Sequence, residues 1–167
     1  MRKIAVVSMG LFLSLFLVKG AAQAAEKIGY IDLSRTFGEY SKTKSYDKTL
    51  SEKEKTYTDE RDKKVADLKT FQDKLNLLND KERDAKKTEL QNKLKSFQDY
   101  DRQKQADLRK EQEEKMKELL GDIQEAVKKY AEKEGFTLVL NDRVLVYQTK
   151  NMDITSQVIE ILNKGGK

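Results

Sequence analysis

The chain has 167 residues, of which 34 are basic and 29 are acidic, and it contains no His, Cys, Trp or Pro. Without Cys it can form no disulfide and carry no lipid on an N-terminal Cys, and without His it lacks the commonest general base and metal ligand. It also has no Gly-rich phosphate loop and no loop with calcium-binding spacing. We therefore expect no enzyme, no cofactor and no metal site.

Residues 1–24 have the parts of a secretory signal peptide: a basic start, an apolar run over 4–18 and a small-x-small cleavage site at 22–24. The alternative is a retained membrane anchor. A membrane-spanning helix needs about 20 apolar residues, and this run is shorter and is followed by a Lys. We therefore expect export, with cleavage after Ala24 or Ala25.

Cleavage there would take three basic residues and no acidic residue from the chain. The mature chain would hold 31 basic residues against 29 acidic ones, a net charge near +2. Phosphate binding draws on clustered Lys and Arg. A charge this low, with alternating signs, argues against a nucleic-acid-binding protein.

The first segment after the cleavage site, Lys27 to Asp32, is short and rich in β-branched and aromatic residues, which predicts a strand. Ser34 is the predicted N-cap of a short helix that runs to about Tyr40. Ser41 is the predicted N-cap of the long helix that follows.

Residues 42–133 contain a single Gly and repeat apolar residues at intervals of three and four, which is typical of helices that pack along a stripe. The repeat stops near Leu78, where Asn79-Asp80-Lys81-Glu82 offers a variant of the capping box. We predict one helix over roughly 42–78 and a second over roughly 80–134, folded into an antiparallel hairpin. The alternative is one continuous helix, which would leave both stripes in water unless partners covered them.

The stripe changes character along the hairpin. Near the turn it is apolar, so the two helices should meet there through Leu68, Phe71, Leu75, Leu78, Leu90, Leu94 and Phe97. In the middle it is polar, at Glu54, Arg61, Lys64, Asp101 and Gln105. Polar positions make a poor packing interface, so we expect the middle of the hairpin to bend.

The hairpin is also unevenly charged. Residues 63–95 include ten basic and six acidic residues, whereas residues 99–134 include nine basic and eleven acidic ones. A positive tip can speed the encounter with an anionic partner; the alternative is a solvated surface that only keeps the helices soluble. The basic residues of this tip are Lys63, Lys64, Lys69, Lys74, Lys81, Arg83, Lys86, Lys87, Lys93 and Lys95.

Strand material returns after the second helix. Gly135 suits the left-handed C-terminal position of that helix. Residues 136–140 and 143–147 predict a β-hairpin around a turn at Asn141-Asp142. A final helix should start at Asp153 or Thr155, with three apolar residues on one side: Val158, Ile159 and Leu162.

The predicted fold is α+β and mostly α. The hairpin arm, residues 42–133, returns the chain to its starting point, so the end segments, 25–41 and 134–167, can share one sheet in a small body. That body has roughly 55 residues and perhaps three strands, a size at which domains are marginal and sheet edges invite pairing. We therefore expect it to oligomerise.

The order of these segments resembles the Skp (OmpH-like) family of periplasmic chaperones over essentially the whole mature chain. The segments that carry the resemblance are KIGYIDLSRTF at 27–37, GFTLVL at 135–140 and MDITSQVIEILN at 152–163, on either side of a long charged helical hairpin. The family's usual Pro near the start of the long helix is absent, and Tyr40-Ser41 stands in its place.

The resemblance implies a homotrimer with a β-barrel-like body and three coiled-coil arms around a cavity. It implies a periplasmic, ATP-independent holdase that binds unfolded outer-membrane proteins and prevents their aggregation. Some family members carry a basic arm cluster proposed to contact lipopolysaccharide. Here Arg109-Lys110 is followed by acidic residues, so that site is not carried over. A transient contact with lipopolysaccharide or another anionic membrane surface stays open.

Four apolar groups of the arm are candidates for contact with such a client: Tyr46, Tyr57, Tyr100 and Met116. The alternative for each is ordinary packing against the neighbouring helix. A structural spacer in the envelope is a second function to weigh, but a rigid rod would favour an uninterrupted apolar stripe.

Overall fold

The computed structural model describes residues 26–165. The predicted signal peptide, at 1–24, and both candidate cleavage sites lie outside the described residues.

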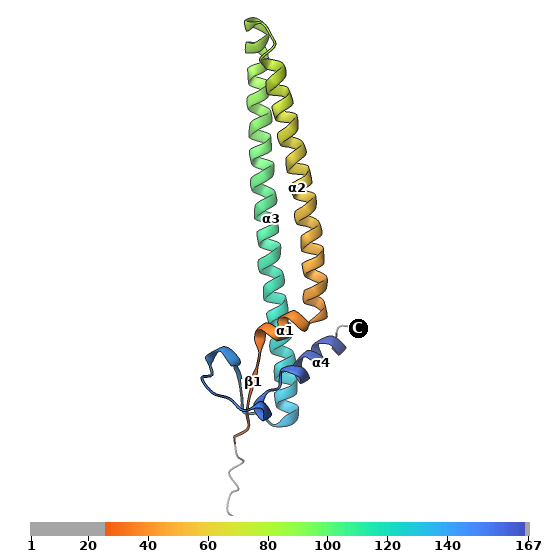
Figure 1. The fold of residues 1–167 in the computed structure, drawn as a ribbon, viewed down its shortest axis with the longest axis vertical. Helices are drawn as coiled ribbons and strands as arrows, with labels where there is room; N and C mark the ends of the chain where they lie inside the picture. Colours follow the sequence, from red (N-terminus) through yellow and green to blue (C-terminus); the bar gives the residue numbers. More distant parts are fainter. Residues whose placement is uncertain (1–25, 166–167) are drawn as a thin grey trace, which may run out of the picture.

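The arm is an antiparallel pair of long helices standing on a small body (Figure 1). Helix α2 spans Ser41–Leu75 and α3 spans Asp80–Glu134. The Asn79 side chain accepts a hydrogen bond from the Glu82 amide at 3.0 Å and starts α3, and Gly135 ends it with a φ of 75°. Both predicted ends of α3 are therefore confirmed, and the alternative of one continuous helix is wrong. None of the helices within residues 26–165 is long and apolar enough to span a membrane.

The two ends of the described chain meet in one sheet. Strand β1 (Ile28–Ile31) pairs in parallel with β2 (Leu138–Asn141), with Ile28 opposite Leu138. Parallel strands require a long crossover connection, which is usually a single helix. Here the crossover is the whole arm, so the predicted sharing of a sheet by the end segments is confirmed.

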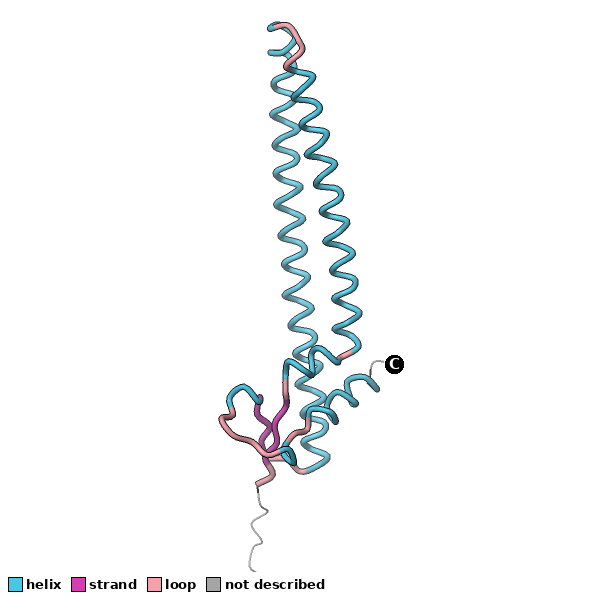
Figure 2. The backbone as a smooth tube through the Cα atoms, in the orientation of Figure 1, coloured by secondary structure: helices cyan, strands magenta, loops and turns pink. Residues whose placement is uncertain are grey.

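The predicted β-hairpin over 136–147 is wrong. After β2 the chain forms two short 3-10 helices, η1 (Asp142–Val144) and η2 (Lys150–Met152), which lie in the loop beside the strands in Figure 2. The Asn141 side chain accepts a hydrogen bond from the Arg143 amide at 3.2 Å, which favours a helical turn over a strand. Because β2 pairs with β1 instead, the described sheet has two strands rather than three.

Two shorter helices complete the body, and they pack against each other. Helix α1 (Leu33–Glu39) is capped by Asp32 and not by the predicted Ser34: the Arg35 amide donates to Asp32 Oδ1 at 2.8 Å. Helix α4 (Thr155–Gly165) starts at the second of the two predicted positions. As predicted, its apolar side is buried, at Val158, Ile159 and Leu162.

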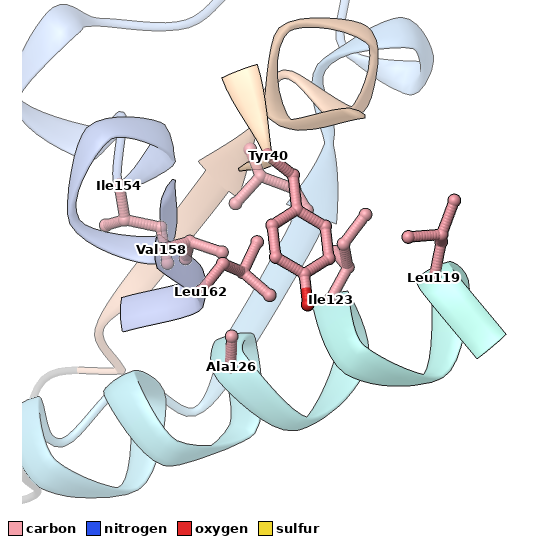
Figure 3. Packing of buried hydrophobic residues seen from close by; sticks show 8 residues of the cluster. Tyr40, Leu119, Ile123, Ala126, Ile154, Val158 and Leu162 are labelled. Carbon is pink, nitrogen blue, oxygen red and sulfur yellow. The ribbon is translucent and has the colours of Figure 1, made fainter. Parts of the chain in front are cut away.

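The core lies where the lower turns of α3 meet α4 and the segment between α1 and α2 (Figure 3). Its labelled members are Tyr40, Leu119, Ile123, Ala126, Ile154, Val158 and Leu162. Full burial of such a side chain is worth about 1.5–3 kcal/mol. The lower end of α3 thus packs against the body, and its other end lies at the tip of the arm.

Candidate functional site

The polar middle of the arm is held by hydrogen bonds between the helices. Asp101 on α3 accepts a hydrogen bond from the Tyr57 hydroxyl on α2 at 2.6 Å and lies 3.3 Å from Arg61 Nε. Gln105 Nε2 donates to the other carboxylate oxygen of Asp101 at 3.0 Å. The polar positions therefore contact one another instead of leaving a gap, and the expected bending of this region stays a prediction.

Two more of the candidate tyrosines also face the neighbouring helix. The Tyr100 hydroxyl donates to the Glu60 carboxylate, and this hydrogen bond is the main cause that raises the pKa of Tyr100 to about 12. Lys64 Nζ lies 4.6 Å from the centre of the Tyr100 ring. The Tyr46 hydroxyl is buried without a hydrogen-bond partner among residues 26–165, and burial raises the pKa of Tyr46. These positions favour packing between the helices.

Met116 differs from the three tyrosines. Its side chain is 52% exposed. It lines a shallow groove on the lower part of α3 together with Leu120 and the backbone position of Gly121. Among the four candidates, Met116 therefore presents apolar surface to solvent most directly.

A second groove lies between α2 and α3 nearer the turn. Leu68, Phe71 and Phe97 line it, and its volume is about 480 Å³. These three residues are among those predicted to meet near the turn. Lys93 Nζ lies 5.3 Å from the centre of the Phe71 ring, so charged groups border the apolar floor.

The basic residues of the tip fall into two groups. Some have partners: Arg83 lies 3.2 Å from Asp80 and Lys86 lies 3.0 Å from Glu89. Seven exposed lysines form no ion pair with any residue that the structure describes: Lys63, Lys64, Lys69, Lys74, Lys81, Lys87 and Lys95. These seven lysines give the tip an accessible positive charge.

The body carries an exposed apolar face, formed by residues for which the sequence predicts a β-hairpin. Its exposed members are Leu138, Val144, Val146 and Tyr147. A groove between the sheet and α3 includes one of these residues, Leu138, and is also lined by Leu120, Val127 and Leu140. The alternation of Val144 and Val146 predicts a strand, but within residues 26–165 the sheet consists of β1 and β2 and does not include this segment.

Within residues 26–165, no group of three or more Asp or Glu side chains is placed to hold a metal ion.

Comparison with known proteins gives a consistent set of matches. The family described as Outer membrane protein (OmpH-like) matches residues 27–162. A Vibrio cholerae protein named Chaperone protein Skp is 34% identical over 162 residues, which is 93% of this chain and 95% of that protein. A Yersinia enterocolitica protein of the same name is 29% identical over 152 residues, which is 89% of this chain and 93% of that protein.

A solved structure shares the fold. It is described as a putative outer membrane chaperone (OmpH-like) from Caulobacter crescentus and matches with a TM-score of 0.77 over 85% of this chain and 86% of that chain. The two sequences are 14% identical, so this likeness concerns the fold alone.

Proposed function

The chain belongs to the OmpH-like family, and we propose that it is an ATP-independent periplasmic holdase chaperone that binds unfolded outer-membrane proteins. Relatives named as Skp chaperones support the class of function. The signal peptide predicted at residues 1–24 supports the compartment.

The observation that carries this proposal is the surface of the arm. It offers shallow apolar grooves, around Phe71 and around Met116, that are bordered by charges of both signs. Strands of outer-membrane barrels alternate apolar and polar residues. Such a strand can place its apolar side chains in the grooves and its polar side chains among the charges, at many weak points rather than one tight site.

We further propose that the protein is a homotrimer assembled through the body. In this proposal residues 25–41 and 134–167 form the body and residues 42–133 form the arm. A two-stranded sheet is marginal by itself, and the exposed face around Val144, Val146 and Tyr147 would leave water on pairing with a second copy. The proposed number of three copies comes from the resemblance to the family.

The test is an aggregation assay. An unfolded outer-membrane protein is diluted from urea with and without the purified mature chain, in the absence of nucleotide, and light scattering is followed. An unrelated protein at the same mass concentration is the control. We expect scattering to fall only with the chain present, and undiminished scattering would contradict the proposal.

The exposed lysines of the tip support a second, transient contact, with lipopolysaccharide or another anionic membrane surface. Cosedimentation with vesicles that contain or lack an anionic lipid tests it. Binding should require the anionic lipid and should weaken steeply as salt rises, whereas suppression of aggregation should depend less on salt.

A further inference from the structure

The chain bends sharply between α1 and α2. Tyr40 has an extended backbone, with φ −72° and ψ 122°, and the two helices leave it in different directions (Figure 1). In a continuous helix each amide donates to the carbonyl four residues earlier. The Ser41 amide and the Glu39 carbonyl lie on opposite sides of the bend, so neither has its usual helical partner across it.

One side chain of α4 satisfies both of these backbone groups. The Ser41 amide donates to Asn163 Oδ1 at 2.8 Å, from 122 residues away in the chain. Asn163 Nδ2 donates to the Glu39 carbonyl at 3.1 Å. A side-chain amide can do this because it holds a donor and an acceptor together. Asn163 thus takes the place of a local N-cap for α2, which neither Tyr40 nor the predicted Ser41 provides.

The same bend is tied to α3 on its other side. The Tyr40 hydroxyl donates to Asp122 Oδ2 at 3.0 Å, and its ring is buried in the core (Figure 3). Lys42, in the first turn of α2, lies 2.6 Å from Asp122 and 2.6 Å from Glu118. The base of α2 is therefore fixed to both α3 and α4.

We propose that Asn163 is a positioning residue of the arm, which holds the bend at Tyr40 and so fixes the direction in which α2 leaves the body. A Pro would restrict the backbone of such a bend covalently, and this chain has none. With Asn163 the base of α2 is held to both α3 and α4, whereas without it the contacts of Tyr40 and Lys42 hold that base to α3 and leave α2 freer to swing relative to α4. A rotation of about 10° at the base of a 35-residue helix moves its far end by about 9 Å.

Any effect of Asn163 on the binding of an unfolded protein rests on the proposed function, because the directions of the arms would set the space between them. The role of Asn163 at the bend does not depend on that function. The test is therefore a distance measured within one chain, which does not depend on what the chain binds.

The distance between the arm and the body is the readout. The chain has no Cys, so Cys residues introduced at the exposed positions Lys63 and Gln157 can carry two spin labels. Labelled chains are mixed with an excess of unlabelled chains, so that pulsed electron paramagnetic resonance reports only distances within one chain.

In Asn163→Ala we expect the width of the distance distribution to at least double, with helical circular dichroism unchanged. Asn163→Asp keeps an acceptor for the Ser41 amide but loses the donor to the Glu39 carbonyl, so its width should be intermediate. Lys164→Ala is the matched control, because Lys164 pairs with Glu160 on its own helix, and its distribution should equal that of the parent.

An unchanged distribution in Asn163→Ala would overturn the proposal. A loss of helical signal in that variant would overturn it too, because Asn163 would then serve the folding of α4 rather than the bend. If the parent fails to suppress aggregation while Asn163→Ala broadens the distribution, the proposed function falls and the role of Asn163 stands.

Discussion

The Tyr57 hydroxyl on α2 donates to Asp101 Oδ1 on α3 at 2.6 Å, and it accepts a hydrogen bond from Gln105 Nε2 at 3.1 Å. The Tyr57–Asp101 pair joins the two helices in the middle of the arm, where apolar side chains would ordinarily pack between them. Lys53 and Glu111 add an ion pair of 2.6 Å nearer the body. Specific polar pairs of this kind fix which turns of two helices lie opposite each other.

Removal of the Tyr57 hydroxyl should destabilise the arm. Tyr57→Phe keeps the ring and loses the hydrogen bond to Asp101, so we expect a loss of about 1 kcal/mol in the free energy of unfolding. Urea unfolding followed by circular dichroism measures it. Tyr130→Phe is the matched control, since the Tyr130 ring packs against the core while its hydroxyl forms no hydrogen bond within residues 26–165. Equal effects of the two substitutions would refute the role of the pair.

Two leucines near the turn should respond differently to the same substitution. Leu75 is 6% exposed and Leu77 is 86% exposed. Leu75→Ala should cost about 2–3 kcal/mol because it leaves a cavity in a packed site, whereas Leu77→Ala should change the stability by less than about 0.5 kcal/mol. Urea unfolding of the two variants side by side is the measurement, and similar losses would show that the turn is not packed as described.

Acid should weaken the ion pairs at the base of the arm. Lys115 and Lys42 lower the pKa of Glu118 from 4.5 to about 2. A lowered pKa in the folded state gives stability that is present above pH 4.5 and lost as the pH falls through about 2. The melting temperature of the parent should exceed that of Glu118→Gln at pH 7, and the gap should close by pH 2. Glu113→Gln, an exposed change on the same helix, should show no such trend.

The exposed face of the body should control the oligomeric state. Val146 is fully exposed in one copy, so Val146→Glu would place a charge in the proposed interface, where burial is costly. We expect sedimentation equilibrium to show a fall in mass from the oligomer towards the monomer. Leu77→Glu puts the same charge on an exposed apolar residue of the arm and should leave the mass unchanged. An unaltered mass for Val146→Glu would exclude this face as the interface.

Met116 should contribute to client binding. Met116→Ser removes exposed apolar surface from the groove on α3, and partial burial of a Met against a client is worth a fraction of the roughly 1.5–3 kcal/mol of full burial. We expect about twofold more of the variant to be needed for half suppression of light scattering. Arg109→Ser changes an exposed residue of the same helix outside this groove and should match the parent. If both variants match it, the groove plays no part in binding.

Features with local causes were predictable from the sequence. Asn79 caps α3 because its side chain reaches the Glu82 amide three residues on, and Gly135 ends α3 because it adopts a positive φ without strain. The apolar stripe near Phe71 predicts a partner for α2. Because the turn between α2 and α3 is short, α3 lies alongside α2 and is that partner.

Features with distant causes were not predictable. Ser34 and Asp32 are both good N-cap residues, and the position of β1 decides between them. The N-cap of α2 comes from Asn163, which no local pattern indicates. The alternation over 143–147 fits a strand, but a strand needs a partner, and β2 pairs with β1. Likewise, spacing alone places Tyr57 on the stripe without showing that its hydroxyl bonds to Asp101.

The parallel pairing of β1 with β2 also sets an order of events during synthesis. Ile28 emerges from the ribosome long before Leu138, its partner in the register. Contacts near the turn between α2 and α3 join residues close in the chain and can form early, whereas the sheet must wait for the last quarter of the polypeptide. A chain that ends before Leu138 therefore has the residues that join α2 to α3 but lacks β2, so in the proposed trimer it could form the arm without the body through which copies would associate.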